Sequence, residues 1–357
     1  MPSAADGDLA AAIADGGPLR FDRFMHLALY GPNGFYTGGG RAGRAGADFI
    51  TSAEVGPLFG AVLARALDAW WDELGRPDPF VVYDAGAGPG TLVRSIRAAA
   101  GRCRDALRLV AVEVSATQRA RHHESVQSTE SLPSEPAYPS QPCIVLANEL
   151  LDNLPFRLLV FDAGWREAHV VLDRGGAGTG GDDIRFVEVL HPVSELPSWL
   201  PATAPHGARV PWQQLAHDWV VDARRLVGAG RVVAFDYVTP RSAELAISPW
   251  RSWLRTYRQH DRGGHYLAAP GSQDITTQVA LDQLPEPDAV RSQAQFLQRW
   301  GIDELVEEGR VAWAAAAAAP TVASLAMRSR VREAEALLDP DGLGGFVVME
   351  WSGRDAR

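Results

Sequence analysis

A glycine-rich turn between an acidic strand end and a helix is the first feature of this chain that could do chemistry. Residues 80–90 read FVVYDAGAGPG, an apolar run that ends at Asp84 and continues through Gly86, Gly88 and Gly90. Residues 91–96, TLVRSI, follow directly and place their apolar side chains at helical spacing. Glycine allows such a loop to adopt unusual backbone dihedrals, and it lets backbone N–H groups approach a ligand closely. The pattern predicts a strand, a tight loop and a helix that together bind a nucleotide-type cofactor.

The acid before the glycines favours a cationic cofactor. A dinucleotide fingerprint spaces its glycines G-x-G-x-x-G, whereas this loop reads G-x-G-x-G. Asp84 would repel a pyrophosphate and attract the sulfonium and amino groups of S-adenosylmethionine. The acid-x-G-x-G-x-G pattern resembles motif I of Rossmann-like methyltransferases. A glycine-rich surface turn and an NAD-linked oxidoreductase are the alternatives.

A second acid follows at the end of the next predicted strand. Residues 107–114 read LRLVAVEV and carry Glu113. In a doubly wound sheet, the carboxyl end of this strand lies beside the glycine loop. Glu113 could then accept hydrogen bonds from both ribose hydroxyls of a nucleoside, although NAD enzymes use an acid in the same way. A solvated carboxylate at the strand end is the alternative.

A third polar segment follows a buried strand at residues 143–147. It begins with Asn148 and Glu149 and continues to Asp152. This is the position of motif IV in methyltransferases, beyond the sulfonium methyl. A later predicted strand, residues 231–237, brings Asp236 to the same carboxyl edge of the sheet, where open α/β folds bind ligands. The alternative for Asn148 and Asp152 is that they only cap a turn.

Composition limits the classes of protein. The 357 residues are 46% hydrophobic and 22% charged, typical of a soluble globular enzyme of one large or two smaller domains. The net charge of −10 argues against nucleic acid as a partner. All 34 basic residues are arginine, which excludes lysine Schiff-base chemistry. Two cysteines suit a reducing compartment and form no metal cluster, and no apolar run reaches membrane-spanning length. We expect a cytoplasmic protein without a bound metal.

The N-terminal region predicts two helices. Residues 18–30 carry apolar side chains at helical spacing, with Pro18 suitably placed at the start. Thr51 and Glu54 then have the spacing of a capping box. They precede a long apolar stripe that runs from Val55 to Leu74.

The rest of the chain predicts an inserted lobe. Residues 156–190 resemble a strand meander, residues 212–227 a helix, and residues 250–278 an aromatic and polar wall that includes His265. Residues 124–142 are rich in Ser, Pro and Glu and have few apolar residues. The resemblance to methyltransferases places the third strand there, so we expect that strand to be short. We expect a helical cap at residues 1–78, a Rossmann-like core at 79–155, 212–240 and 285–357, and a substrate-side lobe at 156–211 and 241–284.

Six segments carry a family resemblance. In order they are FMHLALYGPNGFY, DFITSAEVGPLFG, NELLDNLP, PGSQDIT, QAQFLQRWGI and LLDPDGLGGFVVME. The chain resembles the MidA family, bacterial relatives of a mitochondrial complex I assembly methyltransferase, from about residue 18 to residue 351. The resemblance implies a class I methyltransferase sheet, S-adenosylmethionine as cofactor, and a protein arginine as substrate. Thr51 and Ser52, in the second segment, and Asn148, in the third, join the expected cofactor residues.

The glycine loop departs from the family pattern, which is closer to E-x-G-P-G-x-G. Asp84, Ala87 and Pro89 replace the usual glutamate, proline and basic residue. A catalytically weak or inactive cofactor-binding assembly factor is therefore a second hypothesis.

For the enzyme, a guanidinium substrate arrives protonated, and carboxylates must orient it. We expect Glu149 to do this beside Asn148, with Asp152, Asp236 and His265 as weaker candidates.

Overall fold

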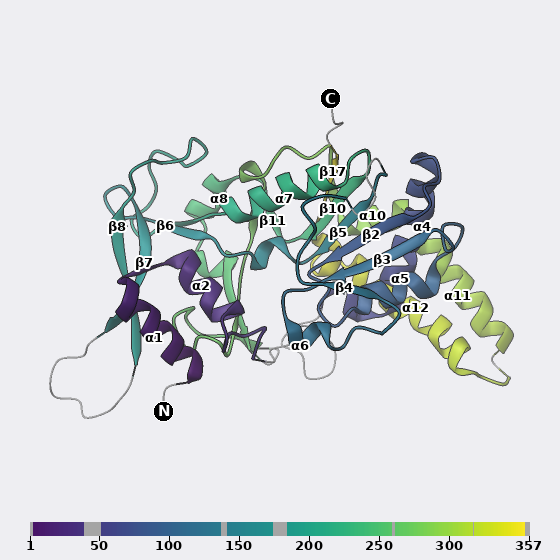
Figure 1. Cartoon of the computed structure of the whole chain (residues 1–357). Helices are drawn as coiled ribbons and strands as arrows, with labels where there is room; N and C mark the ends of the chain where they lie inside the picture. Colours follow the sequence, from purple (N-terminus) through teal and green to yellow (C-terminus); the bar gives the residue numbers. More distant parts are fainter. Residues whose placement is uncertain are drawn as a thin grey trace. The chain divides into compact units, whose positions relative to one another are not determined.

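The computed structural model describes residues 3–38, 51–136, 141–173, 184–258, 261–316 and 318–353. The chain forms two compact units (Figure 1). The first unit comprises Met1–Phe49, Leu151–Trp219 and Tyr237–Glu286, and the second comprises Ile50–Leu150, Val220–Asp236 and Pro287–Arg357. Within the described residues, no helix is both long enough and apolar enough to cross a membrane.

A seven-stranded sheet organises the second unit. Its strand order is β16-β17-β10-β5-β2-β3-β4, and the five strands from β10 to β4 run parallel, whereas β17 is antiparallel to both of its neighbours. The strands are β2 (Phe80–Ala85), β3 (Leu107–Val112), β4 (Gln127–Thr129), β5 (Ile144–Asn148), β10 (Arg231–Asp236), β16 (Ala289–Ser292) and β17 (Val347–Ser352). The predicted α/β sheet is confirmed, including a third strand of only three residues.

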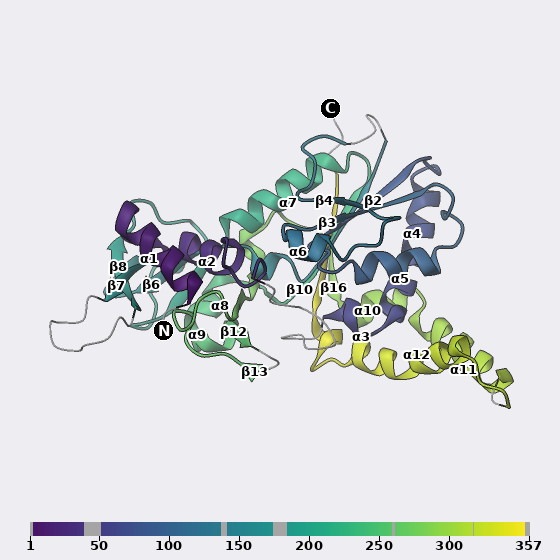
Figure 2. The same cartoon turned by 60° about the horizontal axis from the view of Figure 1, so that its bottom comes forward.

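Helices cover this sheet through one apolar cluster, in which side chains from α4, α5, α10 and α11 pack on the central strands. Figure 2 shows α4 beside α5. The helices of the second unit are α3 (Ser52–Val55), α4 (Pro57–Glu73), α5 (Thr91–Ala99), α6 (Ala116–Arg119), α10 (Gln293–Arg299), α11 (Ile302–Ala316) and α12 (Val322–Leu338). Helix α7 (Gln214–Leu226) begins in the first unit and ends in the second.

The helix start near residue 51 differs from the prediction. The side chain of Thr51 makes no cap hydrogen bond, so the expected capping box is absent. The N–H of Glu54 donates instead to the backbone carbonyl of Thr51 at 2.9 Å. The chain leaves helical geometry at Gly56, and the long helix begins at Pro57, because proline suits the first helical position. Val55 therefore belongs to a separate short turn.

The first unit is built on an antiparallel sheet of order β1-β7-β6-β9, with β8 paired to β7. Its main elements are α1 (Ala4–Gly16), β1 (Leu19–Arg20), α2 (Phe21–Tyr30), β6 (Arg157–Phe161), β7 (Trp165–Asp173), β8 (Arg185–Pro192) and β9 (Arg209–Trp212). Further elements are β11 (Val238–Thr239), α8 (Ser242–Ile247), α9 (Trp250–Trp253), β12 (Leu254–Arg258), β13 (Asp261–Arg262), β14 (Asp274–Thr277) and β15 (Val279–Ala280). The predicted meander is confirmed for β6, β7 and β8.

The N-terminal segment differs from the expected separate cap. Residues 1–49 belong to the first unit, and residues 50–78 belong to the second. Apolar side chains of α1 and α2 form one buried cluster with those of β6 and β7. Figure 1 shows the purple helices α1 and α2 beside the teal strands β6 and β7. The predicted helix start at Pro18 is wrong, because Leu19 and Arg20 pair with β7 and α2 begins at Phe21.

Candidate active site

The glycine loop follows β2 directly and turns through three residues of positive φ. Gly86, Gly88 and Gly90 have φ of 74°, 51° and 75°. At Gly88 the position of an added Cβ is open space, so a side chain there would be disfavoured by the dihedral alone. At Gly90 an added Cβ would lie 3.1 Å from the ring of His122. The loop therefore presents an open, side-chain-free surface at Gly88.

Glu113, directly after β3, holds this loop. One oxygen of its carboxylate accepts from the N–H of Gly88 at 2.9 Å, and the other accepts from the N–H of Ser115 at 2.7 Å. Only 8% of Glu113 is exposed. Burial raises its pKa, and the two backbone hydrogen bonds and Arg119 oppose that rise. The structure thus brings Glu113 beside the loop, as predicted, and shows that its carboxylate also organises the backbone there.

Asp84 is a buried carboxylate with incomplete hydrogen bonding. It is 4% exposed, and its Oδ2 atom has no hydrogen-bond partner among the described residues. Burial, and secondarily the charge of Glu113, raises its pKa to about 7. A buried carboxylate of this kind is costly unless it is protonated or a cation pairs with it. The residues present therefore fit a cofactor that carries a positive charge.

His122 also holds the glycine loop in place, and this role was not predicted from the sequence. Its Nε2 atom lies 2.8 Å from the carbonyl oxygen of Gly88, and its Nδ1 atom lies 2.8 Å from Oγ of Ser128. A carbonyl oxygen only accepts, so Nε2 must carry the proton, and the Ser128 hydroxyl can donate to Nδ1. The peptide groups on both sides of Gly88 are thereby held by side chains, through Glu113 at its N–H and His122 at its carbonyl.

Glu149 lies after β5 with an unusual backbone conformation. Its φ is 52°, a left-handed value that is unfavourable for a residue with a Cβ. Its N–H donates to the carbonyl of Phe235 at 2.8 Å, which ties it to β10. Its Oε1 atom accepts from the Nδ2 of Asn148 at 3.0 Å and from the N–H of Ser52 at 3.2 Å. Backbone strain maintained by specific contacts is common at functional sites.

The structure gathers five of the predicted residues around the carboxyl ends of β5 and β10. Ser52 reaches Glu149 as described, and its hydroxyl donates to Oε1 of buried Gln293 at 2.9 Å. Thr51 flanks the same short helix. Asn148 pairs with Phe235, next to buried Asp236 at the end of β10. Gln293 was not predicted as a site residue, although it opens the QAQFLQRWGI segment.

The other two predicted catalytic residues, Asp152 and His265, belong to the first unit. Buried Asp152 lies in the short helix Leu151–Asn153. His265 contacts the rings of Trp250 and Tyr266 at centroid distances of 5.6 and 4.1 Å. Burial lowers the pKa of His265, so its imidazole favours the neutral form.

A buried polar cluster in the first unit also escaped prediction. The hydroxyl of Tyr36 lies 3.1 Å from Oδ1 of Asp274 and 3.1 Å from Oδ1 of Asn153. Burial, with the nearby charges of Asp274 and Asp152, raises the pKa of Tyr36 well above its usual value. The cluster joins three of the segments that carry the family resemblance. The only signal in the sequence was the presence of aromatic and acidic residues within those segments.

Comparison with known proteins identifies the family and the cofactor. A family model described as an S-adenosyl-L-methionine-dependent methyltransferase matches residues 62–298, more than half of the chain. A solved protein from Burkholderia thailandensis, bound to S-adenosyl-homocysteine, is 25% identical and superposes with a TM-score of 0.79. That similarity covers 99% of this chain and 94% of the other.

Curated relatives are mitochondrial protein arginine methyltransferases. The NDUFAF7 homolog of Drosophila melanogaster is 31% identical over 225 residues, which cover 54% of this chain and 51% of the relative. NDUFAF7 of Danio rerio is 25% identical over 347 residues, covering 84% and 77%. The chain thus spans about half the length of the fly relative. From the family match and the glycine loop with its two acids, the chain belongs to the MidA family of S-adenosyl-L-methionine-dependent methyltransferases.

Proposed function

We propose that this protein transfers the methyl group of S-adenosylmethionine to an arginine side chain of another protein. The observation that carries the proposal is Glu149, whose carboxylate follows β5 and is held by Ser52 and Asn148. A guanidinium is fully protonated at neutral pH, so an oriented carboxylate is the group that binds it and directs its nitrogen. The relatives named as protein arginine methyltransferases support this substrate class.

The chain's own residues bind the cofactor, orient the substrate and exclude water in this reaction. Asp84 offers a buried negative charge to the cationic part of the cofactor, and Glu113 offers acceptors to its ribose hydroxyls. Glu149 and Asn148 would orient the incoming guanidinium, and the buried edge of the sheet would exclude water. The cofactor supplies an activated methyl group when it is bound, so positioning is the main contribution left to the protein.

The alternatives find less support. An NAD-linked oxidoreductase disagrees with the family and with the buried acid at Asp84. An inactive assembly factor was suggested by Ala87 and Pro89. However, these two residues keep the turn of the glycine loop. The N–H of Gly90 donates to the carbonyl of Ala87 at 2.8 Å, and Arg94 donates to the carbonyl of Pro89 at 2.6 Å. The cytoplasmic location stays a prediction.

The test combines binding with product identification. Calorimetric titration should show saturable binding of S-adenosyl-homocysteine and no binding of NADH. A bacterial lysate is then incubated with the protein and methyl-labelled S-adenosylmethionine, and labelled proteins are analysed by mass spectrometry. Methylarginine in a labelled protein supports the proposal. Label on another residue type, or tight cofactor binding without transfer to any protein, contradicts it.

A further inference from the structure

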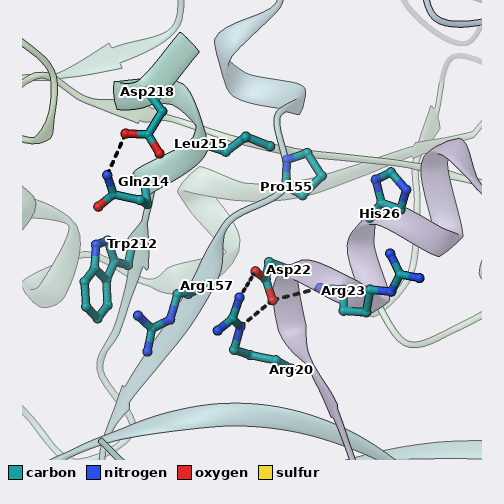
Figure 3. A pocket seen from close by; sticks show the side chains of 10 residues that line it. All are labelled: Arg20, Asp22, Arg23, His26, Pro155, Arg157, Trp212, Gln214, Leu215 and Asp218. Atoms are coloured by element: carbon teal, nitrogen blue, oxygen red, sulfur yellow. Dashed lines mark hydrogen bonds and ion pairs between the residues drawn. The ribbon is translucent and has the colours of Figure 1, made fainter. Parts of the chain in front are cut away.

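The first unit contains a pocket of about 460 Å³ that the proposed reaction does not use. This volume lies within the range of small-ligand sites. Figure 3 shows its walls: Arg23 and His26 from α2 on one side, Gln214 and Asp218 from α7 on another, and Arg20 and Arg157 between them. The remaining lining residues are Asp22, Pro155, Trp212 and Leu215.

Two of the three arginines in the wall are already neutralised. Arg20 donates through Nε and Nη2 to both oxygens of Asp22, at 2.7 and 2.6 Å. Arg157 donates in the same way to both oxygens of Glu167, at 2.6 and 3.0 Å. The Arg157 guanidinium also stacks 3.8 Å from the centroid of the Trp212 ring. These bidentate pairs leave this part of the pocket wall without a net charge.

Arg23 is different. Its guanidinium has no hydrogen bond or ion pair with any other described residue, and its charge adds to the larger effect of burial in lowering the pKa of the His26 imidazole. On the opposite wall, Asp218 accepts a hydrogen bond from Gln214 at 2.8 Å and has no cationic partner within the described chain. The pocket therefore carries an unpaired positive charge on the α2 wall and an unpaired negative charge on the α7 wall.

The depth of the pocket indicates the kind of ligand. Pro155 is buried and Trp212 is half-buried, whereas Arg23, His26 and Leu215 are exposed at the rim. A ligand seated on the apolar floor can therefore continue outward into solvent, as a side chain of a longer polypeptide does.

We propose that this pocket binds an acidic side chain of the protein substrate, with its carboxylate on Arg23 and its apolar stem against Pro155 and Leu215. The polypeptide nature of the ligand rests on the proposed function. The site should also discriminate between substrate sequences. Asp218 should repel a second acidic residue of the substrate on the α7 side and tolerate a basic or neutral residue there. A chain with a net charge of −10 repels acidic partners overall, so such a partner needs a local cation of this kind.

The probe is a capped, fluorescein-labelled heptapeptide with one central Glu, flanked by Leu, Ser and Gly, and its counterpart with Gln. Fluorescence anisotropy is measured with the full chain in the presence of S-adenosyl-homocysteine, so that methyl transfer plays no part. We expect the Glu peptide to bind at least about fivefold more tightly than the Gln peptide at low salt, and the difference to shrink in 0.5 M NaCl. Failure of this binding leaves the methylation assay unaffected, so the two proposals are tested separately.

Three variants test whether Arg23 and Asp218 determine the preference of the pocket for an acidic side chain. Arg23→Glu should abolish the preference for the Glu peptide and favour a Lys peptide instead, and Asp218→Asn should tighten binding of the Glu peptide. Arg185→Glu is the matched control, because Arg185 is an exposed arginine of the same unit outside the pocket. Equal binding of the Glu and Gln peptides, or an equal loss in Arg185→Glu, overturns the proposal. Competition by free glutarate at the same concentration as the peptide overturns the polypeptide assignment.

Discussion

The carboxylate of Glu113 accepts a hydrogen bond from the backbone N–H of Gly88 at 2.9 Å. The same carboxylate accepts from the N–H of Ser115 at 2.7 Å. A residue expected to bind ribose is thus also a structural support for the glycine loop, which is expected to bind the cofactor. Cofactor affinity and local stability should respond together when Glu113 is changed.

Glu113→Ala should weaken binding of S-adenosyl-homocysteine by at least about tenfold. Hydrogen bonds to a charged group contribute about 1.5–3 kcal/mol each, and 1.4 kcal/mol corresponds to a factor of ten in the dissociation constant. The free energy of unfolding without cofactor should also fall, since two backbone N–H groups lose their acceptor. Calorimetry and urea denaturation measure the two effects.

Glu124→Ala is the control for this variant, because Glu124 is an exposed carboxylate on the segment that follows α6. It should change neither quantity. An unchanged dissociation constant in Glu113→Ala would show that Glu113 is only a strand-end carboxylate.

Asp84 should make cofactor affinity depend on pH near neutrality. Its pKa in the folded protein is about 7, above its ordinary value of 3.8, because the group is buried. The folded state therefore holds a proton that the unfolded state has lost, and stability without cofactor should fall as pH rises between these values, by at most about 1.4 kcal/mol per pH unit. Affinity for the cationic cofactor should rise over pH 6–8, as Asp84 ionises.

Asp84→Asn tests this linkage. Without cofactor, the variant should be more stable than the wild type at pH 8, because an uncompensated buried charge is removed. It should bind S-adenosylmethionine more weakly, with little pH dependence between pH 6 and 8. Denaturation and titration at several pH values are the measurements. Parallel pH profiles for the two proteins would assign the dependence to another group.

Local patterns in the sequence account for much of the second unit. The glycine loop, Glu113 after β3, and Glu149 after β5 follow from apolar runs that end in polar residues, because parallel strands bring their carboxyl ends to one edge. The long-range contacts could not be predicted in this way. Tyr36 meets Asp274 across 238 positions of sequence. Residues 1–49 belong to the first unit, where apolar side chains of α1 and α2 pack on β6 and β7. Their helical spacing predicts a buried face but does not show which strands cover it.

Turn geometry was the second feature that could not be predicted from the sequence. The spacing of Thr51 and Glu54 suits a capping box, but the Thr51 side chain makes no cap hydrogen bond to the four-residue helix α3, and the long helix starts separately at Pro57. His122 also lay beyond prediction, because its role depends on a loop that returns its ring to the Gly88 carbonyl.

His122 should affect cofactor binding through the position of the loop. His122→Ala removes the donor to the Gly88 carbonyl, a neutral hydrogen bond that contributes about 0.5–1.5 kcal/mol, so the KM for S-adenosylmethionine should rise about two- to tenfold. The kcat should stay near the wild-type value, because the loop contributes to binding in the ground state and the transition state equally.

His122→Gln is the matched variant, since its amide can donate to Gly88 and accept from Ser128. It should restore most of the affinity. A drop in kcat with unchanged KM in His122→Ala would instead give the imidazole a part in the chemistry.

Glu149→Gln separates an enzyme from a cofactor-binding module. The Oε1 atom of the Glu149 carboxylate accepts hydrogen bonds from the N–H of Ser52 and from Nδ2 of Asn148. The carbonyl oxygen of glutamine can accept both, so the variant should keep the strained backbone and the local geometry while losing the negative charge. Binding of S-adenosyl-homocysteine should stay within about twofold of the wild type. Methyl transfer to protein should fall by on the order of a hundredfold, because a guanidinium that lacks its anion is no longer held in line for reaction. Label transfer and calorimetry on the same preparation measure the two quantities. Equal transfer by variant and wild type would place the substrate-orienting charge elsewhere, and Asp236 would be the next residue to change.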